Sequence, residues 1–156
     1  MKNVVVFDLD GTVINSEHRT PNKDDGTIDL TKYLSLRNRE NLFKDSLLPL
    51  ATIMRQLFHY NYILIATARC VDKDDIDFLK FHNIPYHKIL SRPWSGNYEK
   101  DAKLKRRQLQ RLRNLKQFQN KTWFMFDDAK PVISEMRKIG IVCLNSLKIN
   151  ERLLNA

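Results

Sequence analysis

Short apolar runs alternate with segments of helical periodicity along this chain. Residues 4–7, 62–66 and 123–126 are uninterrupted runs of four or five apolar residues. Such runs are typical of strands that are covered on both faces, as in a parallel sheet. Weaker runs at 86–90 and 141–144 predict two further strands.

Between these runs, large apolar residues recur every three or four positions. The spacing predicts helices at about residues 46–59, 72–82, 98–117 and 131–139. Strands that alternate with helices build βαβ units around a parallel sheet. The sequence therefore predicts an α/β fold, with residues 1–156 forming one domain on a Rossmann-like, doubly wound parallel sheet.

The segment after the first predicted strand is polar. Residues 15–31 include Pro21 and Gly26 and contain few apolar side chains, which favours irregular structure. We expect a small mobile flap at about residues 13–32 and no large cap domain.

The most informative polar residues directly follow predicted strands: Asp8 and Asp10 the first, Thr67 and Arg69 the second, and Asp127 and Asp128 the fourth. Taken alone, Asp10-Gly11 also fits the turn of a β-hairpin between residues 4–9 and 12–14. The carboxyl ends of parallel strands meet at one edge of the sheet, where open α/β sheets bind ligands. The repeated occurrence of polar groups at strand ends therefore favours a shared site over a hairpin.

Carboxylates gathered at one sheet edge would repel each other without a cation between them. Oxygen ligands favour a hard ion, and Mg²⁺ is usual where phosphate is also a ligand. A carboxylate beside Mg²⁺ can attack phosphorus, while a second carboxyl two residues later transfers protons. Thr67 and a lysine can donate to the phosphoryl oxygens. This combination predicts a phosphatase.

Charge and cysteine content narrow the class of protein further. The net charge of +9 implies a field that concentrates anions. Much of the excess lies in residues 100–116, which form either a solvated helix packed by its leucines or a contact surface for a phosphate backbone. Cys70 and Cys143 have neither metal-ligand spacing nor an arginine six positions later, which excludes the cysteine-phosphatase loop. No apolar run could span a membrane and Asp8 interrupts the first one, so we expect a cytoplasmic protein without a signal peptide.

These motifs resemble those of haloacid-dehalogenase-superfamily phosphatases. The segment Asp8-Leu9-Asp10-Gly11-Thr12 matches the first motif, Thr67 the second and Asp127-Asp128 the fourth. The resemblance implies that Asp8 is the nucleophile, that Asp10 is the acid and base, and that Thr12 lies among the substrate-binding residues. It also implies that Mg²⁺ is held by Asp8, by Asp127 and by the backbone carbonyl of Asp10, and that Asp128 lies outside these direct ligands.

Within this superfamily, the chain is similar to the 3′-phosphatase domain of bacteriophage polynucleotide kinase/phosphatase. The likeness lies in Arg19-Thr20-Pro21, in Thr67-Ala68-Arg69, and in Arg92-Pro93 followed by Asp101 and Lys105. It implies that Arg19 and Arg69 contact the substrate or its phosphate, and that Asp101 orients Lys105 toward the phosphoryl oxygens. Spacing alone does not choose Lys105 over Lys100 or Lys103.

Two departures from that pattern stand out. Ala68 replaces a glycine, and Trp94-Ser95-Gly96 carries an extra residue before the third motif, so both can reshape the leaving-group pocket. The chain also lacks the Gly-x4-Gly-Lys-Ser/Thr loop of a kinase.

Three functions are consistent with these observations. The first is a Mg²⁺-dependent phosphomonoester hydrolase that removes 3′-phosphates from polynucleotide ends through an aspartyl-phosphate. The alternative is a phosphatase of free (deoxy)nucleoside monophosphates, and the third is a silent nucleic-acid-binding module. The expected partners are nucleic-acid ends or nucleotides, and no membrane. Only a polynucleotide enzyme should lose substrate binding steeply with salt.

Overall fold

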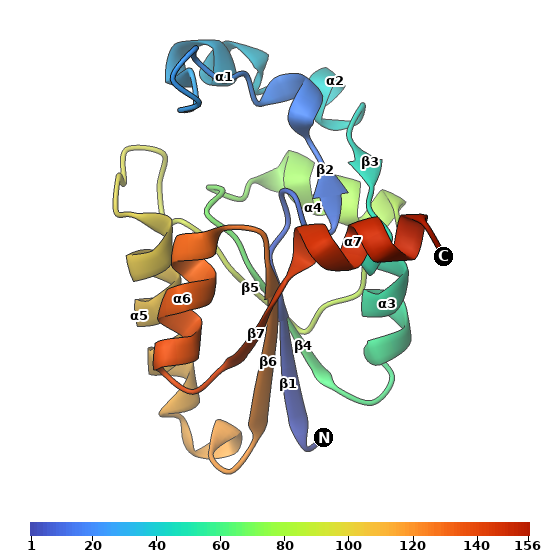
Figure 1. Cartoon of the computed structure of the whole chain (residues 1–156), viewed down its shortest axis with the longest axis vertical. Coiled ribbons are helices and arrows are strands. Elements are labelled where there is room, and N and C mark those ends of the chain that lie inside the picture. The colour runs from blue at the N-terminus through green and yellow to red at the C-terminus, as the bar shows by residue number, and fades with distance from the viewer.

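A parallel five-stranded sheet with the order β5-β4-β1-β6-β7 forms the centre of the computed structural model, which describes residues 1–156 (Figure 1). Its strands are β1 (Asn3–Phe7), β4 (Tyr62–Ala66), β5 (Lys88–Leu90), β6 (Thr122–Asp127) and β7 (Val142–Asn145). The chain builds one half of the sheet outward from β1, then returns to add β6 and β7 on its other side. The expected doubly wound α/β fold is confirmed, and its switch point lies between β1 and β6.

The central strand β1 has neighbours on both sides, which explains its continuous apolar sequence. Val5 is paired with Ile63 of β4 and with Phe124 of β6. Because side chains alternate along a strand, Val4 and Val6 enter one core and Val5 and Phe7 enter the other. A hairpin at Asp10-Gly11 is therefore wrong, since both edges of β1 are already occupied.

Helices cover both faces of the sheet, and all four predicted helices form. They are α3 (Leu50–Leu57), α4 (Lys73–Phe81), α5 (Asp101–Arg113) and α6 (Lys130–Lys138). Helices α5 and α6 pack on the face of Val4, whereas α3 and α4 pack on the face of Val5. None of the helices combines the length and the apolar character that a membrane crossing requires.

The C-terminal helix α7 (Ser146–Leu154) has no counterpart among the predicted elements, which end with the strand at 141–144. Its buried residues are the polar Ser146 and Asn150, while Leu147 and Leu154 are exposed. An apolar stripe therefore does not mark its buried face. This explains why hydrophobic periodicity missed the helix.

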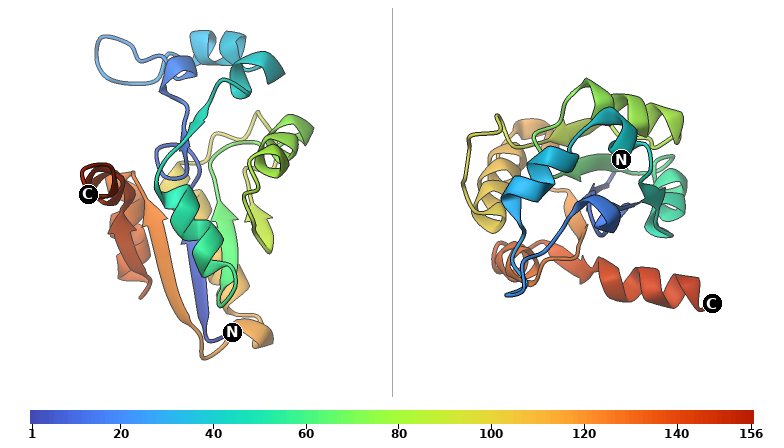
Figure 2. Two further views of the ribbon diagram at one scale, coloured as in Figure 1. Left: turned by 90° about the vertical axis from the view of Figure 1, so that its right-hand side faces the viewer. Right: turned by 90° about the horizontal axis from the view of Figure 1, so that it is seen from above.

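The expected flap is the first half of a longer insertion. Between β2 (Ile14–Asn15) and β3 (Ser46–Leu47), which pair antiparallel, the chain forms η1 (Glu17–Arg19), α1 (Leu30–Leu36) and α2 (Arg39–Leu42). We call residues 16–45 the insertion. It stands over the carboxyl edge of the sheet (Figure 2). Helix α1 buries none of its residues, so its sequence carries little signal of packing.

Candidate active site

A tight loop after β1 presents Asp8 at the centre of the carboxyl edge. The carbonyl of Leu9 accepts hydrogen bonds from the backbone N–H groups of the three residues 12–14, which turns the chain immediately after the strand. Gly11 has a φ of +76°, and a side chain there would collide with the carboxylate of Asp128. The glycine thus allows the loop to lie against the end of β6.

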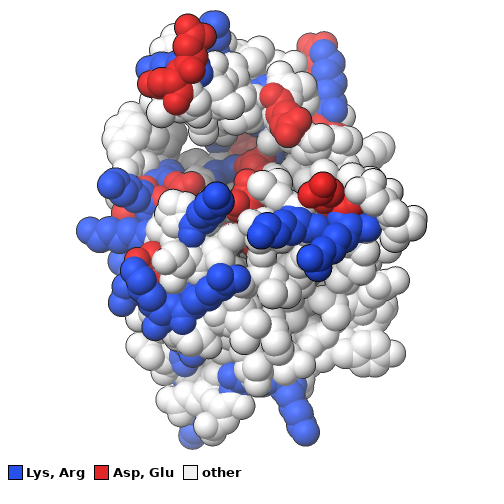
Figure 3. Space-filling model, in the orientation of Figure 1, with Lys and Arg blue, Asp and Glu red and all other residues white.

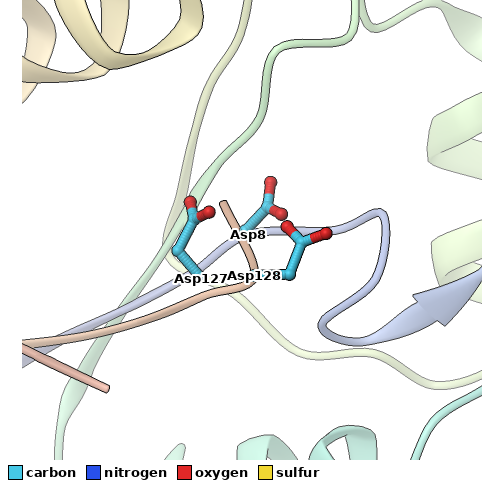
Figure 4. A group of neighbouring side chains, drawn as sticks. All are labelled: Asp8, Asp127 and Asp128. Atoms are coloured by element: carbon cyan, nitrogen blue, oxygen red, sulfur yellow. The ribbon is translucent and has the colours of Figure 1, made fainter. Parts of the chain in front are cut away.

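Three carboxylates from two adjacent strands converge beside this loop (Figure 4). One oxygen from each of Asp8, Asp127 and Asp128 lies within 4.8 Å of the others. The buried Lys105 lies among them, and its Nζ donates to Asp8 Oδ1 at 2.9 Å and to Asp127 Oδ2 at 2.7 Å. Of the three candidate lysines, Lys105 is the one that reaches the carboxylates, whereas Lys100 and Lys103 are both exposed.

The cluster carries more negative than positive charge. Burial raises the pKa of Asp8 well above its ordinary value; Lys105 opposes this rise, whereas Asp127 and Asp128 add to it. Burial also raises the pKa of Asp128. Burial would lower the pKa of Lys105, but Asp8 and Asp127 outweigh it and raise that pKa. A single ammonium thus faces three carboxylates, two of them buried and the third, Asp128, half-buried. This set of oxygen ligands fits Mg²⁺.

The side chain of Asp10 is paired with an arginine. Its Oδ1 accepts from Arg69 Nη2 and from Ser16 Oγ, both at 2.6 Å, and its Oδ2 accepts from Arg69 Nε at 2.8 Å. Burial by itself raises the pKa of Asp10, but the charge and hydrogen bonds of Arg69 lower it to about 2. Asp10 is therefore ionised in this structure. That its backbone carbonyl binds a metal stays a prediction.

Two buried arginines connect the insertion to the core beside Asp10. Arg19 Nη2 donates to Asp45 Oδ2 at 2.7 Å, and Arg19 Nε donates to the two oxygens of Asp45 at 2.9 and 3.1 Å. Arg69 Nη2 lies 3.6 Å from Asp45, and Arg69 Nη1 donates to Asp75 at 2.9 Å. Arg19 and Arg69 come from distant parts of the sequence. The structure brings both of these predicted site residues to the same carboxylate, Asp45.

Sequence reasoning missed the two carboxylates that hold these arginines. Asp75 closes a capping box with Asp72 at the start of α4, so an Asp-x-x-Asp pattern marked its position but not its partner. Asp45 lies between α2 and β3 and belongs to no motif. Only the fold brings it to Arg19.

The two threonines have different surroundings. Thr67 Oγ1 accepts the backbone N–H of Arg69 at 3.1 Å, which leaves its hydroxyl hydrogen to donate elsewhere. Thr12 has no exposed surface; its Oγ1 lies 2.8 Å from Ser146 Oγ and donates to Asp8 Oδ2 at 3.5 Å. Thr12 therefore connects α7 to the loop after β1, and its full burial does not support the expected contact with substrate.

The predicted pair between Asp101 and Lys105 is wrong. The Asp101 side chain is 54% exposed and accepts from Arg92 Nη2 at 2.8 Å, whereas Lys105 is directed into the carboxylate cluster. Spacing of four residues along a helix permits such a pair, but a buried cluster of opposite charge competes for the ammonium. Arg92, missed as a site residue, instead anchors the loop before α5.

The surface is hollowed between the insertion and the core, with acidic and basic side chains inside the opening (Figure 3). A second hollow, of about 60 Å³, lies between the insertion and α4. Arg19 and Arg69 line it, together with Tyr33, Arg37, Asn38, Leu42, Asp72, Asp74 and Asp75. None of the three clustered carboxylates lines this second hollow.

Comparison with known proteins identifies the family of the chain. A family model described as bacteriophage T5 5′-deoxynucleotidase matches residues 1–156. The 5′-deoxynucleotidase of Escherichia phage T5 is 32% identical over a 169-residue alignment, which covers 95% of this chain and 68% of that protein.

Several solved structures share the fold at low sequence identity. A chain of the Pnkp1/Rnl/Hen1 RNA repair complex has a TM-score of 0.70 at 21% identity, and the match covers 93% of this chain but only 42% of that one. A putative phosphatase from Clostridium difficile has a TM-score of 0.67 at 18% identity and 93% and 86% coverage. A hydrolase from Streptococcus pneumoniae TIGR4 has a TM-score of 0.63 at 14% identity, with both chains fully covered. The expected haloacid-dehalogenase fold is confirmed.

Proposed function

Because the chain belongs to the bacteriophage T5 5′-deoxynucleotidase family, we propose that it is a phosphatase that removes the 5′-phosphate from free deoxynucleoside monophosphates. The family supports the second of the two substrates predicted from the sequence over the first, the 3′-phosphate of a polynucleotide end. The observation that carries the chemistry is the buried Asp8, held by Lys105 at the centre of three carboxylates.

In the proposed reaction, Asp8 attacks the phosphorus in line with the departing 5′-oxygen. The bond between phosphorus and that oxygen breaks as an aspartyl-phosphate forms, and Asp10 transfers a proton to the leaving oxygen. Asp10 then takes a proton from the water that hydrolyses the intermediate. Asp10 is ionised while Arg69 occupies both of its oxygens. Before Asp10 can act as an acid, Arg69 must release the carboxylate, which then takes up a proton from solvent; the arrival of the negatively charged substrate favours both changes.

The remaining residues neutralise charge and orient the reacting groups. Lys105 fixes the rotamer of Asp8 and balances part of the charge of the cluster, and Thr67 donates its hydroxyl hydrogen to a phosphoryl oxygen. Asp8, Asp127 and Asp128 would hold Mg²⁺, which supplies positive charge to the phosphoryl oxygens when bound.

Phosphate release from a panel of esters tests this function. The panel holds 5′- and 3′-deoxynucleoside monophosphates, 5′-ribonucleotides and 3′-phosphorylated oligonucleotides, each with Mg²⁺ and with EDTA. We expect turnover of the 5′-deoxynucleotides with Mg²⁺ only. Fastest turnover of the 3′-phosphorylated oligonucleotides, with binding that weakens steeply as salt rises, would instead support polynucleotide end repair.

The variant Asp8→Asn tests the nucleophile, and Asp24→Asn, which alters an exposed carboxylate of the insertion, is its control. We expect Asp8→Asn to abolish phosphate release and Asp24→Asn to preserve it. Activity retained by Asp8→Asn contradicts the mechanism. The absence of hydrolysis of every ester by the unmodified protein would favour the silent binding module.

A further inference from the structure

The loop between β5 and α5, residues 91–100, exposes aromatic rings at the carboxyl edge of the sheet. Trp94 is 61% exposed and Tyr98 is 80% exposed, whereas the other tryptophan, Trp123, is 3% exposed in the core. An indole ring is largely apolar and is usually covered in a folded protein. This loop is also the place where the sequence carries an extra residue, within Trp94-Ser95-Gly96.

The loop is held firmly against the catalytic strand ends. The guanidinium of Arg92 donates to the carbonyls of Ala68 at 2.9 Å, Asn97 at 3.0 Å and Glu99 at 2.7 Å. The backbone N–H of Arg92 donates to the carbonyl of Arg69 at 2.9 Å. Trp94 therefore lies two residues after Arg92, whose side chain is hydrogen-bonded to the segment between Thr67 and Arg69.

The position of the loop suits the part of a nucleotide that lies beyond its phosphate. The loop lies at the carboxyl edge of the sheet, on the same side as α1 (Figure 1), and the surface is open between the insertion and the core (Figure 3). The loop then leads into α5, whose second turn places Lys105 on Asp8. A nucleotide whose phosphate meets Asp8 must extend its sugar and base outward through this opening.

We propose that Trp94 is the platform on which the base of the nucleotide substrate stacks. This inference rests on the proposed function and adds base recognition to it. Stacking tolerates different bases, because each presents an aromatic face. The Oδ1 of the nearby Asn97 accepts from Arg92 Nη1 and from the backbone N–H of Glu99, so the acceptor of this amide is engaged in holding the loop. The platform accordingly binds several deoxynucleotides, and binds the larger purines more tightly.

A pair of substrates separates base stacking from catalysis. A 5′-deoxynucleotide and 2-deoxyribose 5-phosphate carry the same phosphate and sugar, but only the nucleotide has a base. We expect Trp94→Ala to raise KM for the nucleotide about tenfold, the order of one lost stacking contact, with kcat within about twofold. We expect Trp94→Phe to restore most of this loss, and the loss to be confined to the base-bearing substrate.

The control variant is Tyr60→Ala, because Tyr60 is also 80% exposed but precedes β4 at the opposite edge of the sheet. It should leave both substrates unaffected. An unchanged KM for the nucleotide in Trp94→Ala overturns the proposal, as does an equal loss on both substrates. If the unmodified protein hydrolyses other phosphomonoesters but no 5′-deoxynucleotide, the proposed function itself fails.

Fluorescence gives a readout that does not depend on turnover. In an Asp8→Asn background, a 5′-deoxynucleotide should quench the emission of Trp94, while inorganic phosphate and 2-deoxyribose 5-phosphate should not. The quenching should disappear in Asp8→Asn/Trp94→Phe, since the remaining Trp123 is buried. Equal quenching in both backgrounds would contradict the placement of the base on Trp94.

Discussion

At the scale of single residues, Lys105 decides the charge balance of the site. It is buried, and its ammonium donates to Asp8 and Asp127. The neighbouring Lys103, on the same helix, is exposed. Two lysines separated by one turn or less thus differ completely in environment, because the helix directs only one of them into the carboxylate cluster.

We expect Lys105→Met to lower kcat at least about 100-fold, since one buried donor to reacting groups typically contributes that much. Lys103→Met, its matched control, should stay within about twofold. Steady-state kinetics on a 5′-deoxynucleotide measures both. Comparable losses in the two variants would mean that the general basic field, rather than the buried ammonium, matters.

Asp128 provides a test of the excess negative charge. Burial raises the pKa of Asp128, so keeping it ionised in the folded protein at neutral pH costs folding stability. The cost vanishes below the ordinary pKa of 3.8, where the carboxyl is protonated in both the folded and the unfolded protein. We expect Asp128→Asn to stabilise the metal-free protein at pH 7 by about 1 kcal/mol, or roughly 2–4 °C in Tm. The gain should shrink toward pH 3.8 and also when Mg²⁺ is added. Thermal melts with EDTA or Mg²⁺ check this, and a destabilised variant would refute it.

At the scale of elements, α7 and the insertion both act on the site through buried polar contacts. Helix α7 reaches the loop after β1 through Ser146 and Asn150, and the insertion reaches Asp10 through Arg19, Asp45 and Arg69. Such contacts leave almost no trace in hydrophobic periodicity. They nevertheless hold the loop after β1 and the side chain of Asp10 in place.

Asn150 holds α7 and the loop after β1 together. Its Nδ2 donates to the carbonyl of Thr12 and its Oδ1 accepts the backbone N–H of Leu50, both at 2.9 Å. Asn150→Ala leaves both backbone groups without their partner, so we expect a loss of about 2–4 kcal/mol in the free energy of unfolding. Urea denaturation measures it, with the exposed Lys148→Ala as a control that should change stability by less than about 0.5 kcal/mol. Similar midpoints for the two variants would disprove the role of Asn150.

Asp45 is the buried anion of the insertion. Asp45→Ala removes the ion pair of Arg19 inside the protein, so we expect a destabilisation of about 3–5 kcal/mol. The comparison is Arg39→Ala, which removes exposed ion pairs with Asp74 and Asp77 and should cost about 1 kcal/mol or less. Chemical denaturation of both variants decides whether the insertion is held by its buried or its exposed pairs.

At the scale of the whole molecule, the basic charge is partly balanced by local pairs. On α5, Arg106 pairs with Glu135 and Arg107 with Glu99, while Leu104 and Leu109 face the core. These contacts support the interpretation of residues 100–116 as a solvated helix packed by its leucines. The side chains on the two faces of the sheet pack into two separate cores, and Cys143 lies in one of them.

Cys143 reports the opening of that core. Burial raises the pKa of its thiol to about 12, and the nearby Asp127 adds to this, so the reactive thiolate is scarce in the folded protein. We expect a thiol reagent at pH 8 to label only the partly exposed Cys70 in native protein and both cysteines in urea. The variant Cys70→Ser should then label only after unfolding. Rapid native labelling of that variant would contradict a closed core.

The sequence by itself determined the strands, the four main helices and the polar groups at the strand ends. These follow from local rules, because burial on both faces demands continuous apolar runs and a glycine permits the turn after Asp8. The tertiary structure alone decided which charges meet. It paired Lys105 with Asp8 rather than Asp101, and it placed Asp45 on Arg19. The reason is physical: periodicity sets the face on which a side chain lies, whereas distances between remote residues depend on how the elements pack.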